Sequence, residues 1–336
     1  MSLNVESKKY DTLVDDGPRK ASLEEVPVID LAALMNGQDL SSVVESLRTA
    51  CKETAFFYVK NHGVAPDVIR DVFAASREFF GSPLDERLQI TRNHYNRGYI
   101  PMGATQLPGK APDLKDSFDL GVDLPLDDPA VVAGVPFHGP NQWPADASFR
   151  DRVERYFSEV QLLGMKMLRV FALALDLEED YFVKLYESPV VSMRLLHYPQ
   201  PLKSDGEIEV GSGIHTDYGV FTILYQDPAG GLELQKPDGE WIAAPFIDNT
   251  FVINLGDLMA RWTNDVFRSN PHRVVNRTGR ERFSIAAFLN PTYSTVVSCL
   301  PTCQSEENPA RYDPIGAGEY VMNKIKANQF RQSATN

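Results

Sequence analysis

Two short segments in the second half of the chain carry residue types that bind metal ions. The segment GIHTDYGVFTILYQD begins with His215 and Asp217, which share a face if both lie on one strand. A third candidate, His272, opens the predicted strand in NPHRVVN. Two histidines and one carboxylate form the facial triad that holds non-haem Fe(II) and leaves other positions open. These three residues are therefore candidate metal ligands, although a His-x-Asp triplet alone also fits a surface hydrogen-bonding pair.

Two further predicted strands each place polar side chains on one face. In RERFSIAAF, the alternation puts Arg282, Ser284 and Phe288 together. An Arg offers a bidentate fork and a Ser offers a hydroxyl donor, so this pair can hold a carboxylate. In RLLHYP, Arg194 and Tyr198 share a face by the same parity, and a buried Arg is costly unless an anion pairs with it. The alternative for the first segment is a surface Arg beside a core Phe.

The whole chain has the composition of a globular protein and is acidic. Of its 336 residues, 43% are hydrophobic and 24% are charged, and the formal net charge is -13. This charge disfavours nucleic acids and anionic membranes as partners, because both require a basic patch. No apolar run reaches the length of a membrane span, and the polar N-terminus lacks the apolar core of a signal peptide. Three cysteines without a CxxC motif argue against disulfides or structural zinc, so we expect a reducing, cytoplasmic setting.

The elements that must position these residues change in character along the chain. Residues 1–25 are expected to be flexible, and residues 26–150 mix short strands and helices with a long Gly- and Pro-rich loop region. Residues 151–188 carry long supporting helices. Strand-like runs separated by turns fill residues 189–295, and residues 296–336 end in a closing helix. The pattern predicts a mainly β fold with flanking helices and a barrel-like core.

Local signals predict where several helices begin. Asp39 is the expected N-cap of one helix, and Ser82 the expected N-cap of another, with Pro83 at its first helical position. A long amphipathic helix is predicted from Ala147 to Leu177. A shorter helix is predicted in EEDYFVKLYE, directly after it.

The ordered motifs resemble the isopenicillin N synthase-like family of Fe(II)/2-oxoglutarate oxygenases. The resemblance rests on the His-x-Asp pair, the later His and the Arg-x-Ser pair, and extends into the first half through VPVIDL, AFFYVKNHG and REFF. The segments RLLHYP, HTDYG, DLMARWTND and NPHRVV are most similar to thymine 7-hydroxylase-like members. The family fold is a double-stranded β-helix, or jelly roll, which agrees with the strand-rich second half.

The resemblance implies how Fe(II) and 2-oxoglutarate would be bound. The three candidate ligands would hold Fe(II), and Arg282 and Ser284 would bind the distal carboxylate of 2-oxoglutarate. Tyr198 stands where the family often has a Tyr that reaches the same carboxylate. The usual Asn-x-Tyr motif is here Leu196-His197-Tyr198, so the Asn is missing.

The resemblance also implies residues that contact the substrate. Arg194, Tyr218 and Phe288 match positions that line the substrate site, while the alternative for Tyr218 and Phe288 is core packing. The long loop region carries further candidates: Tyr95, Arg97, Tyr99 and Phe118. Together these features favour a small polar or anionic substrate, such as an amino acid, a pyrimidine or a secondary metabolite.

The implied activity is hydroxylation with O2, in which 2-oxoglutarate is converted to succinate and carbon dioxide. Desaturation and ring formation begin with the same hydrogen abstraction and stay open. Three other functions also stay open: a same-family oxidase that does not use 2-oxoglutarate, an ethylene-forming enzyme, and a non-catalytic binding protein. The complete triad argues against the last of these. The sequence does not indicate an oligomeric state.

Overall fold

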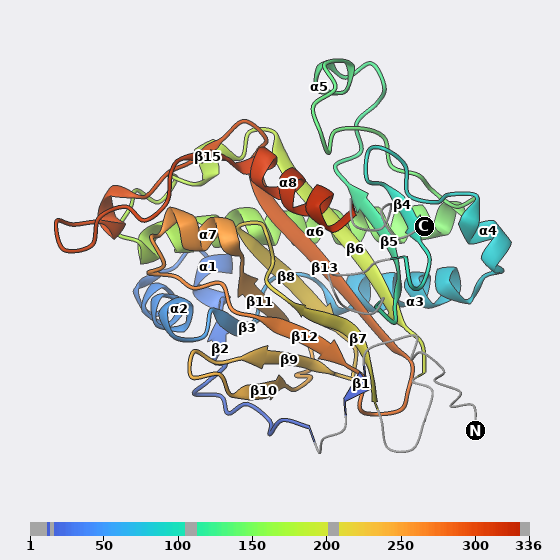
Figure 1. Ribbon diagram of the computed structural model, residues 1–336, viewed down its shortest axis with the longest axis horizontal. Coiled ribbons are helices and arrows are strands. Elements are labelled where there is room, and N and C mark those ends of the chain that lie inside the picture. Colours follow the sequence, from blue (N-terminus) through green and yellow to red (C-terminus); the bar gives the residue numbers. More distant parts are fainter. Residues whose placement is uncertain (1–11, 14–16, 105–112, 201–207, 330–336) are drawn as a thin grey trace, which may run out of the picture.

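Two β-sheets packed against each other form the centre of the molecule, with helices covering the larger sheet (Figure 1). The computed structural model describes residues 12–13, 17–104, 113–200 and 208–329. Of the segment predicted to be flexible, residues 1–11 and 14–16 lie outside the described residues. The predicted fold class, mainly β with flanking helices and a jelly-roll core, is confirmed.

The larger sheet has eight strands in the order β2-β3-β11-β8-β13-β6-β5-β4. All neighbours pair antiparallel except β2 and β3, which are parallel. In that order the strands are Val28–Asp30, Phe56–Lys60, Phe251–Leu255, Phe221–Gln226, Arg282–Thr292, Pro189–Tyr198, Asp116–Gly121 and Gly98–Ile100.

The smaller sheet has five strands in the order β1-β7-β12-β9-β10. In that order the strands are Thr12–Leu13, Ile208–His215, His272–Val275, Leu232–Gln235 and Trp241–Ala244. A separate pair joins β14 (Val296–Val297) to β15 (Ile315–Gly316). The larger and the smaller sheet meet through shared apolar clusters. One of these clusters joins Val274 of β12 to Tyr198 of β6.

Most helices precede the strand-rich core in the sequence, α7 interrupts it, and α8 follows it (Figure 1). They are α1 Ala32–Met35, α2 Ser41–Glu53, α3 Pro66–Gly81, α4 Leu84–Leu88, α5 Pro129–Val132, α6 Ala147–Ala174, α7 Asp257–Trp262 and α8 Ala317–Gln329. Two short 3-10 helices cover Val183–Leu185 and Pro301–Cys303.

Strand β13 divides its side chains between the helix-covered core and the interior between the sheets. Phe283, Ile285 and Leu289 belong to the main core that includes α3 and α6. Ala286 and Phe288 instead join the small cluster that faces the second sheet. Successive residues of a strand point to opposite faces, so this one strand both anchors the sheet to the helices and lines the interior.

Several predicted helix boundaries are wrong by a residue or more. Helix α6 begins at Ala147 as predicted but ends at Ala174 instead of Leu177. Its N-cap is Asp146, whose carboxylate accepts a hydrogen bond from the Ser148 amide. Asp39 is not an N-cap, because its carboxylate accepts from the Ser41 hydroxyl and Leu40 takes the cap position. Ser82 ends α3 instead of opening α4, since its hydroxyl donates to the Phe79 carbonyl.

The predicted helix in EEDYFVKLYE is also wrong. Only the short 3-10 helix at Val183–Leu185 forms there. Phe182 and Tyr186, on either side of it, are both buried. Because these two side chains are buried, they anchor the connection between α6 and β6 to the core without a longer helix.

His197 connects β6 to its surroundings through charge and ring stacking. Its Nδ1 lies 2.6 Å from a carboxylate oxygen of Asp116 and its Nε2 lies 2.7 Å from one of Glu281. The imidazole ring stacks against both Phe80 and Phe283, with centroid distances of 5.2 and 4.9 Å, and the two phenyl rings also contact each other. Burial alone would lower the pKa of His197, but the two carboxylates outweigh burial and raise it.

This network predicts a pH-dependent contribution to stability. Because the folded-state pKa of His197 is raised, its stabilisation is fully present below the unfolded pKa and is lost as the pH rises through the folded pKa. We expect His197→Gln to lower the free energy of unfolding by about 1–3 kcal/mol near pH 6, and by less near pH 9. Denaturant unfolding of both proteins at the two pH values measures this difference. His94→Gln, at an exposed histidine, is the control. An equal loss for His197→Gln at both pH values would contradict the charge assignment.

Candidate metal centre and cosubstrate site

His215, Asp217 and His272 come together at one end of the smaller sheet. His215 is the last residue of β7 and His272 the first of β12, and the two lie opposite each other in the antiparallel pair. Their metal-binding atoms, with those of Asp217, all lie within 4.8 Å of one another. Asp217 Oδ1 is 3.9 Å from His215 Nε2 and 3.8 Å from His272 Nε2. A single ion between these atoms can contact all three residues.

Asp217 reaches this position from a turn, not from a strand. The expectation that His215 and Asp217 share a face of one strand is wrong, because β7 ends at His215 and β8 begins only at Phe221. The turn between these strands is what brings the carboxylate next to the two imidazoles. The residues converge as expected, but for a different structural reason.

Hydrogen bonds leave one metal-facing atom free on each of the three residues. The Nδ1 atoms of His215 and His272 lie 2.8 and 3.3 Å from the carbonyl oxygens of Gly213 and Asn270. An Nδ1–H that donates to a carbonyl leaves Nε2 with a lone pair for a metal. Asp217 Oδ2 accepts hydrogen bonds from two side chains, Thr222 Oγ1 and, at 2.6 Å, Asn254 Nδ2. Asp217 Oδ1 therefore remains for a metal ion, and the donor set fits Fe(II).

The electrostatics of the three residues also suit a metal site. Burial, reinforced by the neighbouring His272, lowers the pKa of His215 to about 4. Burial opposes the ionisation of Asp217, but the adjacent histidines and the two side-chain hydrogen bonds outweigh it and lower the pKa of Asp217. At neutral pH His215 is therefore a neutral imidazole and Asp217 a carboxylate. These are the protonation states that bind a divalent ion.

The start of α7 holds the turn that carries Asp217. The amides of Gly256, Asp257 and Leu258 donate to the carbonyls of Val220, Asp217 and Gly219 at 3.0, 2.8 and 3.0 Å. A Cβ atom on Gly256 would lie 2.4 Å from the Gly219 oxygen and 2.8 Å from the Asp217 oxygen. The turn can therefore approach α7 this closely only because residue 256 is a glycine.

Arg282 and Ser284 form a buried pair with one uncommitted donor. Both lie on the inner face of β13, where Arg282 Nη1 donates to Ser284 Oγ at 2.9 Å and Nε donates to the Gly230 carbonyl. Arg282 is fully buried, and its Nη2 has no hydrogen-bond partner among the described residues. The Tyr198 ring lies opposite, 4.6 Å from the guanidinium carbon. A buried guanidinium donor without a partner requires an acceptor, and the distal carboxylate of 2-oxoglutarate fits it.

The three residues expected to contact substrate come from the paired strands β6 and β13 and from the turn that carries Asp217. Arg194 on β6 donates through Nε and Nη2 to both carboxylate oxygens of Asp119, each at 2.6 Å. Phe288 is half-buried beside the cluster that includes Tyr198. Tyr218 follows Asp217 in the turn, with Lys324 Nζ of α8 5.7 Å from its ring centroid.

Three of the four residues suggested as substrate contacts in the long loop region are buried. Arg97 is buried and donates to the backbone carbonyls of Tyr95, Asn96 and Phe137. Tyr99 and Phe118 belong to the main core. In the structure Arg97 forms hydrogen bonds to the backbone, and Tyr99 and Phe118 pack in the core. Their place in a long loop region was the basis for suggesting them as substrate contacts.

Sequence reasoning missed the side chains that support the centre. Thr222 and Asn254 are polar residues within the apolar runs GVFTILYQD and FVINL, and an isolated buried polar residue is a recognisable signal. Asp113 and Lys115 are buried as well, and no sequence pattern indicated them. Asp113 accepts from the Gly213 amide at 3.0 Å, next to the carbonyl that orients His215.

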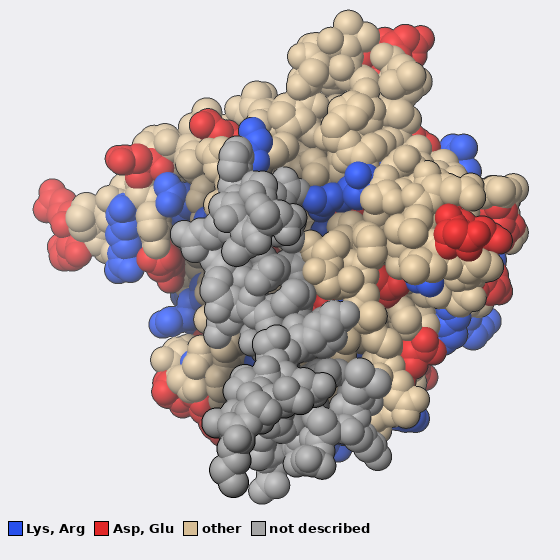
Figure 2. Space-filling model, turned by 45° about the vertical axis from the view of Figure 1, so that its right-hand side comes forward, with Lys and Arg blue, Asp and Glu red and all other residues tan. Residues whose placement is uncertain are grey.

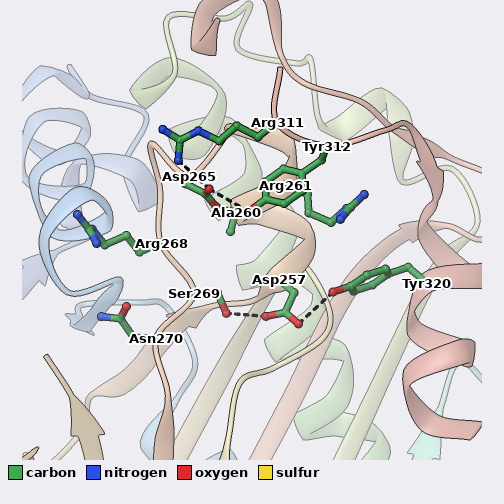
Figure 3. Close-up of a pocket in the computed structure, with 10 residues that line it drawn as sticks. All are labelled: Asp257, Ala260, Arg261, Asp265, Arg268, Ser269, Asn270, Arg311, Tyr312 and Tyr320. Carbon is green, nitrogen blue, oxygen red and sulfur yellow. Dashed lines mark hydrogen bonds and ion pairs between the residues drawn. The ribbon is translucent and has the colours of Figure 1, made fainter. Parts of the chain in front are cut away.

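A cavity of about 570 Å³ lies between α7 and the segment that leads into α8 (Figure 3). Its lining includes Asp257 and Asn270, whose backbone atoms contact Asp217 and His272. Its two carboxylates already have partners. Asp257 accepts from the hydroxyls of Ser269 and Tyr320, and Asp265 pairs with Arg311 (Figure 3). These contacts tie α8 to the start of α7, so we interpret the cavity as part of that structural junction.

Comparison with known families identifies the chain. Residues 190–291 match the family described as 2OG-Fe(II) oxygenase superfamily, and residues 26–146 match the one described as non-haem dioxygenase in morphine synthesis N-terminal. The chain therefore belongs to the 2OG-Fe(II) oxygenase superfamily, as its motifs suggested. It is a 2-oxoglutarate-dependent dioxygenase, an enzyme that requires Fe(II), 2-oxoglutarate and O2.

Individual relatives agree with this assignment. The 2-oxoglutarate-Fe(II) type oxidoreductase hxnY of Emericella nidulans is 37% identical over 319 residues, covering 92% of this chain and 91% of its own. The full-length thymine 7-hydroxylase of Neurospora crassa in complex with alpha-KG is 30% identical, with a TM-score of 0.81, covering 93% of this chain and 99% of its own. The same protein with alpha-KG and thymine superimposes with a TM-score of 0.80 at 30% identity, covering 90% and 96%. Within the described residues, no helix is both long and apolar enough to cross a membrane.

The close approach at Gly256 gives a first prediction about the site. Gly256→Ala must push the turn carrying Asp217 away from α7, so we expect roughly tenfold weaker metal binding and about 1–3 kcal/mol of lost stability. Anaerobic calorimetric titration with Fe(II) measures the affinity. Gly81→Ala, at a helix end where an added Cβ meets nothing within 4 Å, is the control. Unchanged affinity in Gly256→Ala would refute the coupling between α7 and Asp217.

The hydrogen bond from Asn254 gives a second prediction. Asn254→Leu removes one of the two donors that fix Asp217 Oδ2, which frees the carboxylate to rotate. We expect about 10–100-fold weaker Fe(II) binding, in line with losses of such supporting groups elsewhere. The same titration applies, with Asn323→Leu on the exposed side of α8 as control. Equal affinity in the two variants would mean that Asn254 does not orient the ligand.

Proposed function

We propose that His215, Asp217 and His272 bind the Fe(II) of this oxygenase. The proposed enzyme hydroxylates a small polar or anionic molecule and releases succinate and carbon dioxide. The core of the enzyme is the segment 189–295. In the sequence, the N-terminal region 26–150 precedes this core and the closing helix follows it. The observation that carries the proposal is the triad geometry, with one free metal-facing atom on each residue.

Arg282, Ser284 and Tyr198 are proposed to bind the distal carboxylate of 2-oxoglutarate. The buried, unpartnered Nη2 of Arg282 supports this assignment, because it needs an acceptor in the interior between the sheets. Ser284 Oγ accepts from Arg282 and keeps its own hydrogen for the carboxylate. These residues would hold the distal carboxylate of 2-oxoglutarate, whose other end would be free to bind the metal ion.

The other residues are proposed to position substrate and exclude water. When bound, Fe(II) and 2-oxoglutarate supply the O2-activating oxidation chemistry, which the side chains cannot provide. Arg194, Tyr218 and Phe288 would orient the substrate so that the bond to be oxidised faces the centre. The apolar interior formed by Leu196 and Ala286 limits water, which suppresses side reactions. The thymine bound in the Neurospora thymine 7-hydroxylase structure supports a small molecule of this size.

A prediction follows for cosubstrate binding. Anaerobic titration of the protein with Fe(II) and 2-oxoglutarate should give the weak visible charge-transfer band of the chelate. Arg282→Ala should raise the 2-oxoglutarate concentration needed for half of that band by about 100-fold, because it removes a buried charged partner. Arg280→Ala, at an exposed arginine two residues away, should leave it unchanged.

The outcomes of this titration distinguish hydroxylation from 2-oxoglutarate fragmentation and from an oxidase that does not use 2-oxoglutarate. His215→Ala should give no band and no succinate, and normal turnover in that variant would refute the metal assignment. A band without succinate release in the presence of candidate substrates, but with ethylene in the headspace, would replace hydroxylation by 2-oxoglutarate fragmentation. Iron binding without any effect of 2-oxoglutarate would contradict the cosubstrate site.

A further inference from the structure

Two ion pairs line the interior near the proposed metal centre, and each is internally neutral. Arg194 uses Nε and Nη2 to bind both oxygens of Asp119. Lys115 Nζ lies 2.7 Å from Asp113 Oδ2 and 2.8 Å from Ser212 Oγ, on the strand that ends at His215. In each pair the carboxylate cancels the charge of the cation. Neither Arg194 nor Lys115 therefore offers an unbalanced charge to a ligand.

A third cation, Arg92, lies beside the first of these pairs without a carboxylate of its own. Its Nη1 is 4.0 Å from Asp119 Oδ2, the oxygen that already accepts from Arg194 Nη2 at 2.6 Å. Within the described part of the chain, its guanidinium donates no hydrogen bond. The Arg92 side chain is 27% exposed, so it is partly desolvated yet accessible. A partly buried guanidinium whose donors are uncommitted is stabilised by an incoming anion.

The contact with Asp119 places Arg92 beside the inner face of the larger sheet, at the edge of the proposed substrate site. Asp119 of β5 lies opposite Arg194 of β6, and Arg194 lies opposite Ala286 of β13. Ala286 is followed on the same face by Phe288, one of the proposed substrate contacts. Arg92 therefore extends the row of inner-face residues that starts beside the 2-oxoglutarate clamp.

The charged residues of this row, taken together with the Lys115–Asp113 pair, have a positive net charge. The three cations Arg92, Arg194 and Lys115 face the two carboxylates Asp113 and Asp119. Figure 2 shows Lys and Arg atoms in a recess near the middle of one face, while most Asp and Glu atoms on that face lie toward its edges. Burial lowers the pKa of Arg92, and the like charge of Arg194 adds to this effect; Asp119 opposes both but does not outweigh them.

We propose that Arg92 binds an anionic group of the substrate, such as a carboxylate, and so selects anionic over neutral small molecules. This inference rests on the proposed function, because it places the anion in the substrate site of the same metal centre. The Arg194–Asp119 pair then acts as a neutral wall that positions Arg92 and does not itself neutralise the substrate. The substrate class is thereby narrowed to small organic anions.

The test uses propionate and its neutral counterpart propionamide as probes. The protein is loaded with Mn(II) in place of Fe(II) and with 2-oxoglutarate, which occupies the Arg282 clamp. Paramagnetic relaxation of the probe protons then reports binding near the metal. We expect propionate to bind the unsubstituted protein at least tenfold more tightly than propionamide. Arg92→Gln should weaken propionate binding roughly tenfold, the loss expected for one charge-assisted contact, and leave propionamide unchanged.

Two variants serve as controls for charge and for folding. Arg92→Lys keeps the charge and should retain most of the preference for propionate. Arg70→Gln removes an exposed arginine on α3 and should change nothing. Thermal unfolding of all variants identifies any that do not fold. If Arg92→Gln does not fold, the role of Arg92 is judged from Arg92→Lys and from the binding of the two probes to the unsubstituted protein.

The outcomes distinguish this inference from the proposed function. Equal propionate binding in the unsubstituted protein and Arg92→Gln would overturn the role of Arg92 and indicate contact with the metal itself. Equal binding of the two probes, or no propionate binding at all, would overturn it as well. If relaxation of water protons shows that Mn(II) does not bind, the proposed metal centre fails, and the inference fails with it.

Discussion

The two oxygens of the Asp217 carboxylate have different partners, and the arrangement of the site depends on that difference. Thr222 and Asn254 bind one oxygen, and the other faces the two imidazoles. The supporting residues lie opposite each other on neighbouring strands β8 and β11. A carboxylate left free in a buried turn would be costly to desolvate, whereas this one is fixed in orientation before any ion arrives. The large sheet thus supplies the support, and the small sheet supplies the two imidazoles.

The pairing of β7 with β12 provides the second half of this arrangement. His215 and His272 are directly opposed, which brings their ring centroids to 4.3 Å. The register between the strands shifts immediately after His272 and again before Val275. Such irregularities bend a strand and re-aim its side chains, and they are frequent next to active sites. Here they let β12 deliver one residue to the centre and then continue as a packed strand against β9.

The sequence predicted this site well where the relevant residues lie on one regular strand. Arg282 and Ser284 share a face of β13 because strand alternation is strictly local, and the Arg-to-Ser hydrogen bond follows from it. The same rule failed for Asp217, since a strand end is set by tertiary packing that local pattern does not encode. The strand-rich core was predictable from turn signals and apolar runs, whereas helix caps such as Asp39 were misplaced by a residue or two.

Contacts between distant segments were beyond sequence reasoning. Arg194 was expected to need an anion, and its partner Asp119 lies 75 residues earlier in the chain, in a strand with no marked pattern. The supporting amide of Asn254 is likewise 37 residues from Asp217. No period or motif connects such positions in one sequence. Only the order of strands in the sheet determines which of the many polar residues become neighbours.

The short strand β1 has a consequence for the strand that ends at His215. Residues Thr12 and Leu13 pair with Glu209 and Ile208 of β7, which would otherwise be the outer strand of the smaller sheet. An unpaired outer strand exposes backbone donors and acceptors that can recruit a strand from another molecule. The N-terminal segment thus shields the start of β7 from intermolecular pairing. Its loss would expose that stretch to self-association and disturb the strand at the end opposite His215.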